Sequence, residues 1–62
     1  MNHNIKFLLK GTILEDHTQY SVCIQDHTGQ EIDIQAISFN GAAIFMERLA
    51  FLGCTRLPDE VL

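Results

Sequence analysis

Apolar and polar residues alternate along three stretches in the first two thirds of the chain. Apolar side chains fall mostly on every second position within residues 4–14, 18–25 and 30–37. This period is that of a β-strand with one buried face. Short polar segments separate the stretches, and Gly29 in the second segment suits the left-handed position of a tight turn. Because short turns join antiparallel neighbours, the pattern predicts a three-stranded antiparallel meander.

One helix is predicted over residues 40–52, where charged residues are almost absent. Its apolar residues that share one face, at about 100° per residue, are Ala42, Phe45, Leu49 and Leu52. Ile44 and Phe51 point well away from that face, so the helix is apolar nearly all round. A helix of this kind is a buried helix. A chain of 62 residues has little material to cover both sides of it, which predicts a folded-back tail, a second copy or a foreign partner on the second side.

The simplest architecture is an α+β fold in the order β-β-β-α, with the helix packed across the apolar face of the meander. The predicted inward set comprises Ile5, Phe7, Leu9, Ile13, Tyr20, Val22, Ile24, Ile32 and Ile34 from the strands, with the four residues of the first helix face. Residues 1–62 have room for a single small domain. The tail, residues 53–62, fits either a short helical turn or an extended arm, and the strand order stays open.

Composition and charge narrow the class of partner. The apolar fraction of 47% is that of a globular protein, and eight acidic against four basic residues give a formal charge of -4. Such a chain repels phosphate backbones, which disfavours direct nucleic-acid binding. An acidic surface can instead meet a basic protein, including one that itself handles nucleic acid. With neither a signal peptide nor a run of roughly 18 apolar residues, we expect a soluble, cytoplasmic protein without membrane contact.

Candidate chemistry is sparse. Cys23 and Cys54 are predicted to be thiols rather than a disulfide in a reducing compartment. His17 and His27 bracket a strand of about eight residues at about 3.3 Å each, which places them too far apart for one metal ion. Acidic neighbours of Cys23 would raise the pKa of its thiol and oppose nucleophilic activity. We therefore expect no catalysis, no metal and no cofactor.

A further pattern points toward RNA. The spacing of residues 10–13, 20–24 and 36–38, with Gly11 and Gly29, resembles the strand spacing of Sm-like RNA-binding barrels. The resemblance covers less than half of the chain and implies an Sm-like or OB-like small barrel that forms a ring oligomer and binds single-stranded RNA. In the Sm-like family the helix precedes the strands, whereas here it follows them, so no residue role is transferred.

The favoured interpretation is a small acidic interaction module that either self-associates as a homodimer or binds and inhibits a larger protein. A small metal protein or enzyme accessory is the rival class. Two groups of candidate partner-binding residues follow. The first is the helix group, Ile44, Arg48 and Phe51, and the second is the acidic stripe Glu31 and Asp33 with Asp26 at the adjoining turn.

Overall fold

A computed structural model describes residues 4–36 and 38–61 of the chain. Three strands are followed by one helix and two very short strands. In chain order these elements are β1 (Lys6–Ile13), β2 (Thr18–Gln25), β3 (Glu31–Ala36), α1 (Phe39–Phe51), β4 (Thr55–Arg56) and β5 (Glu60–Val61). The fold is α+β, as predicted, and the helix begins and ends one residue earlier than the predicted 40–52. Residue 37, the predicted end of the third strand, lies outside the described residues.

The sheet is larger and more mixed than the predicted three-stranded antiparallel meander. Its order is β3-β2-β1-β4, and β5 also pairs with β1. The pairs β1·β2 and β2·β3 are antiparallel, whereas β4 and β5 both run parallel to β1. The prediction of a purely antiparallel meander is therefore wrong, because the tail returns along the free side of β1 as an extended arm.

The core lies between α1 and the first two strands. Its buried members are Phe7, Leu9, Val22, Ala42 and Met46. A helix about 10 Å wide covers roughly two strands spaced 4.8 Å apart, so three strands cannot all lie beneath it. The helix accordingly packs mainly on β1 and β2. Four residues of the predicted inward set are instead exposed, namely Ile13, Ile32, Ile34 and Leu52.

Local signals define where the helix starts and stops. The Ser38 hydroxyl accepts a hydrogen bond of 3.0 Å from the Gly41 N–H, which caps the first turn. Gly53 takes a positive φ of 93° just beyond the last turn. The Gly53 N–H then donates to Ala50 and the Cys54 N–H to Leu49, the bond pattern of a Schellman C-cap. This cap turns the chain back toward β1.

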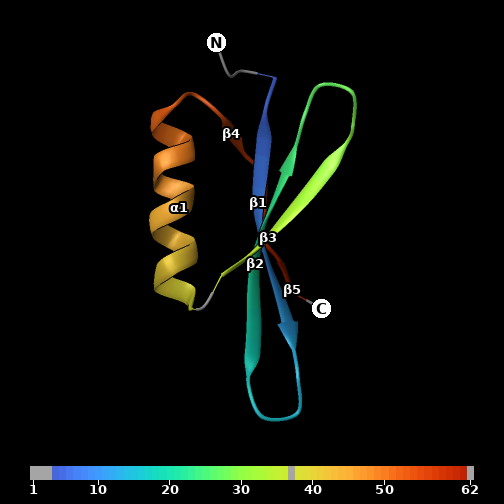
Figure 1. The fold of residues 1–62 in the computed structure, drawn as a ribbon, viewed down its shortest axis with the longest axis vertical. Helices are drawn as coiled ribbons and strands as arrows, with labels where there is room; N and C mark the ends of the chain where they lie inside the picture. The colour runs from blue at the N-terminus through green and yellow to red at the C-terminus, as the bar shows by residue number, and fades with distance from the viewer. Residues whose placement is uncertain (1–3, 37, 62) are drawn as a thin grey trace.

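The molecule is elongated, with extents of 40 × 22 × 16 Å. Figure 1 shows α1 lying along one side of the sheet, while the turn between β1 and β2 projects beyond the end of the helix. Ile13 lies in that projecting part, which explains its exposure. The turn before β3 and the start of β3 swing away from α1 (Figure 1), so Ile32 is uncovered, whereas the Ala36 end of β3 approaches the helix.

Candidate protein-interaction site

The two edges of the sheet differ in whether another strand forms hydrogen bonds with their backbone N–H and C=O groups. On the β1 side, the Thr55 N–H donates to the Ile5 carbonyl at 2.9 Å and the Leu57 N–H to the Phe7 carbonyl at 2.8 Å. Further along, Glu60 and Val61 pair with β1 in parallel register. The tail therefore closes this edge of the sheet with the chain's own residues.

The opposite side of the sheet ends at β3, and no described strand pairs with its outer edge. Five of its six residues are exposed. They include two large aliphatic side chains, Ile32 at 63% and Ile34 at 41% exposure. An unpaired edge presents a row of backbone N–H and C=O groups that can pair with another chain. We call residues 31–36 the β3 edge.

An apolar groove of about 270 Å³ runs beside the β3 edge, between β3 and the first half of α1. Ile34 and Ala36 line it from β3, Val22 from the neighbouring strand, and Gly41 and Phe45 from the helix. The groove is smaller than the roughly 300–1,000 Å³ of small-molecule sites. Its size and apolar lining suit one or two side chains of another protein.

The other face of the same edge is acidic. Glu31 and Asp33 alternate with the two isoleucines and so lie together on the sheet face away from α1, as the sequence predicted. The Lys10 ammonium lies 3.6 Å from the Asp33 carboxylate, and Asp33 is the main cause of a raised Lys10 pKa. Among the ion pairs of the described residues, none includes Glu31.

Glu31 instead accepts a hydrogen bond from the thiol of the fully buried Cys23, at 3.1 Å. Burial first, and then the hydrogen bonds to Glu31 and Asp33, raise the pKa of Cys23 to about 12. The thiol is therefore neutral at physiological pH, which opposes a nucleophilic role. The pKa direction predicted from the acidic neighbours is confirmed.

Asp26, the third acidic candidate, lies in the turn before β3 and serves that turn. One of its carboxylate oxygens accepts hydrogen bonds from the Thr28 N–H, the Thr28 hydroxyl and the Gln30 N–H. The bond from the Thr28 hydroxyl is the main cause of a lowered Asp26 pKa. This is an Asx-type turn, and Gly29 completes it with the positive φ of 87° that its position predicted.

The helix group is separate from the β3 edge. Ile44, Arg48 and Phe51 follow one another at intervals of four and three residues, so they form one ridge along α1, which we call the helix ridge. Its members are all exposed, Ile44 at 56% and Phe51 at 92%. The tail pairs with β1 and leaves the helix ridge uncovered.

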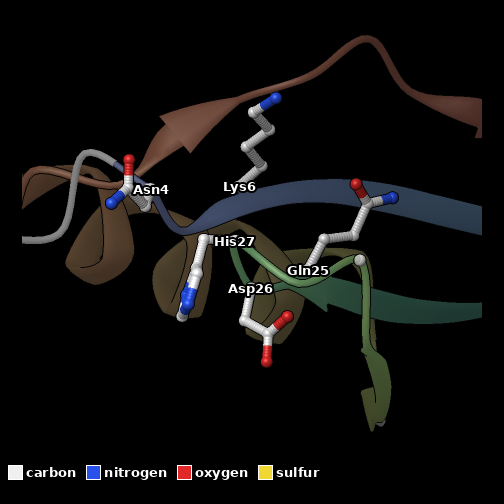
Figure 2. A pocket seen from close by; sticks show the side chains of 6 residues that line it. Asn4, Lys6, Gln25, Asp26 and His27 are labelled. Carbon is white, nitrogen blue, oxygen red and sulfur yellow. The ribbon is translucent and has the colours of Figure 1, made fainter.

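The described surface has other polar hollows, and one on the sheet face away from α1 is lined by Thr12, Gln19, Ser21, Asp33 and Gln35. A shallow hollow at the end of the sheet is lined by Asn4, Lys6, Gln25, Asp26, His27 and Gly29. Figure 2 shows Lys6 pointing to one side of the strand pair and Asp26 and His27 to the other, so these side chains do not share a focus. Within residues 4–36 and 38–61, no three His, Cys, Asp or Glu side chains are grouped to hold a metal.

Ile32 and Ile34 are the residues that sequence reasoning missed as candidates. Their alternation predicts burial, whereas β3 is the third strand of the meander and the single helix α1 is wide enough to cover only about two strands. The mismatch between the width of one helix and the width of three strands was the signal in the sequence that β3 could be uncovered.

The described helix is too short to cross a membrane.

No family model, curated protein or solved structure matches this chain.

Proposed function

We propose that this protein is a non-catalytic interaction module that binds a larger protein through the β3 edge and the groove beside it. The observation that carries the proposal is the exposure of Ile32 and Ile34 on an unpaired strand. Apolar side chains and unpaired backbone groups coincide there, and strand addition from another chain satisfies both at once. The acidic face of the same strand favours a basic partner, which includes proteins that handle nucleic acid.

The chemistry of the described residues favours binding over catalysis. The Cys23 thiol is buried and neutral, and the polar side chains around the hollow of Figure 2 diverge. Asp26 is occupied by its own turn. Two unbridged thiols suit a reducing compartment, which supports a cytoplasmic location as part of the proposal. A module without catalytic activity can act on its partner by occupying a surface, so inhibition of the bound partner is the proposed effect.

Affinity capture from the native cell tests this proposal with a matched pair of variants. Ile34→Asp puts a charge into the β3 edge, and Ile13→Asp makes the same change at an exposed isoleucine in the projecting turn region. We expect a partner that the wild type and Ile13→Asp retain and Ile34→Asp loses. Equal capture by all three baits, or a wild-type bait with no partner, contradicts a binding role for the β3 edge.

Self-association through the helix ridge is the second candidate, favoured by the almost complete exposure of Phe51. Full burial of Ile44 and Phe51 would contribute about 1.5 to 3 kcal/mol each before any association cost. Light scattering after size exclusion tests this candidate at high protein concentration. A dimer that Phe51→Ser dissociates and Ile34→Asp leaves intact assigns the contact to the helix ridge, and a strictly monomeric particle removes it.

A further inference from the structure

The two faces of the β3 edge carry opposite kinds of side chain, and this alternation identifies the partner. On the α1 side lie Ile32 and Ile34, both exposed, and on the other side lie Glu31 and Asp33, both exposed. A strand added to this edge must place its own alternate residues against each set. The added strand therefore needs apolar residues at one parity and residues compatible with carboxylates at the other.

A second copy of β3 does not meet that need. In a two-fold antiparallel pair centred on Ile32, Glu31 faces the Asp33 of the other copy. Centring the pair on Asp33 brings the two Asp33 carboxylates directly opposite each other, and centring it on Ile34 leaves them on the diagonal. Like charges opposite each other destabilise a strand pair, and neither copy brings a new cation. The carboxylates thus disfavour the registers centred on Ile32 and Asp33, and the register centred on Ile34 brings no new cation to Glu31.

The cations already present in the chain do not satisfy the edge. Lys10 reaches Asp33 from β1 at 3.6 Å, while the hydrogen bond that Glu31 accepts comes from the neutral thiol of Cys23. Glu31 is in none of the ion pairs of the described residues, and its electrostatic effect on Lys10 is weaker than that of Asp33. This leaves a position on the acidic face that a lysine or arginine from another chain would complement.

On this basis, which rests on the proposed function, we infer that the β3 edge binds an extended segment of a partner protein in which basic and apolar residues alternate. The basic side chains lie opposite Glu31 and Asp33. The apolar side chains lie against Ile32 and Ile34, and the one nearest Ala36 enters the groove that Phe45 lines. The six residues of β3 match a segment about 20 Å long at 3.3–3.4 Å per residue.

Three synthetic peptides of eight residues with blocked ends test the inference. The first alternates lysine and valine, the second alternates glutamate and valine, and the third holds the lysines and valines in two separate blocks. Binding to the intact ¹⁵N-labelled protein is followed by amide chemical shifts. We expect the first peptide to shift the amides of β3 and to bind about tenfold more tightly than either other peptide, from two favourable cross-strand pairs.

Charge exchange sharpens the test. Glu31→Lys should weaken binding of the lysine peptide about tenfold and improve binding of the glutamate peptide. Glu15→Lys makes the same change of charge in the exposed turn between β1 and β2 and should alter neither. If Glu15→Lys weakens binding as much as Glu31→Lys, or if the block peptide binds as tightly as the alternating one, attraction is by net charge alone and the inference fails.

The outcome separates the partner's chemistry from the function of the edge. If none of the peptides shifts the β3 amides while Ile34→Asp still abolishes capture of the cellular partner, the edge binds a different kind of segment and only the alternating basic strand is wrong. A concentration-dependent dimer that Ile34→Asp dissociates assigns the edge to a second copy and likewise overturns the inference. If no peptide shifts the β3 amides and Ile34→Asp captures the cellular partner as well as the wild type does, both proposals are overturned.

Discussion

The two edges of the sheet are treated in opposite ways by the same short chain. The β1 edge receives the C-terminal arm, whose N–H groups donate to Ile5 and Phe7. The β3 edge receives no described strand, although it carries Ile32 and Ile34 in the open. The chain covers the edge next to its core and leaves the other edge open.

This difference separates the part of the molecule that forms the core from the part that we propose to bind a partner. β1 holds Phe7, Leu8 and Leu9, all buried, so an open β1 edge would expose the central strand to water and to other chains. β3 holds no fully buried residue, so it can be offered to a partner at little cost in stability. The predictions below test this division, beginning with the covered edge.

Removal of residues 54–62 should have the largest effect. It deletes the hydrogen bonds from Thr55 and Leu57 to β1 and the packing of the half-buried Cys54 and Leu57. At about 1 kcal/mol per hydrogen bond plus lost apolar burial, we expect the free energy of unfolding to fall by about 3 kcal/mol or more. Urea denaturation measures the change. Val61→Ser, a change at an exposed tail residue, is the control and should have little effect; an unchanged midpoint in the truncated chain would mean that the arm is not structural.

Val22→Ala and Ile34→Ala compare the two regions at adjacent positions. The two residues are cross-strand partners on the same face of the sheet, but Val22 is buried and Ile34 is exposed. We expect a loss of about 2 kcal/mol for Val22→Ala and less than about 1 kcal/mol for Ile34→Ala, although the latter removes more atoms. Denaturation of both variants under one condition decides the matter. Equal losses would place Ile34 in the core and weaken its assignment to a binding surface.

The sequence predicted the secondary-structure elements better than it predicted which of their faces are buried by other elements. Period-two alternation identified the three long strands, and the near absence of charge identified α1, because both are local properties of the chain. The same alternation assigned Ile32 and Ile34 to the interior. A pattern shows which face of a strand is apolar, but it does not show whether another element reaches that face.

The closed edge was beyond local reasoning for a different reason. β4 and β5 have two residues each, too few to show a period, and their pairing with β1 joins residues about fifty positions apart. Of the candidate residues, Glu31 and Asp33 were correctly placed on one strand face because parity alone decides it. The role of Asp26 in its turn depended on carboxylate hydrogen bonds, which only the structure shows.

The buried thiol of Cys23 should make stability fall at alkaline pH. Its pKa is about 12 in the folded protein against 9.0 for an unperturbed thiol, so above pH 9 the unfolded chain loses a proton that the folded chain keeps. The free energy of unfolding then falls as pH rises, by about 1 kcal/mol between pH 9 and pH 10. Below pH 9 the stability that depends on the protonated Cys23 thiol is fully present. Denaturation of the wild type and Cys23→Ala across this range isolates the thiol from other titrating groups. Equal pH slopes in the two proteins would show that the thiol ionises freely in the fold.

The ion pair between Lys10 and Asp33 should give the smallest effect, and it reports on the open edge. Asp33 is the main cause of the raised Lys10 pKa, so Asp33→Asn should lower that pKa toward its ordinary value, as followed by NMR titration of the lysine side chain. Because Asp33 is 54% exposed, Lys10 is partly exposed, and salt screens such a pair, we expect no resolvable change in the unfolding midpoint. Glu15→Gln, which neutralises a distant carboxylate, is the control and should leave the Lys10 pKa in place. Binding of a basic strand to the β3 edge would compete for the same carboxylate, so addition of the alternating lysine peptide should shift the Lys10 pKa downward in the wild type and shift it less in Asp33→Asn.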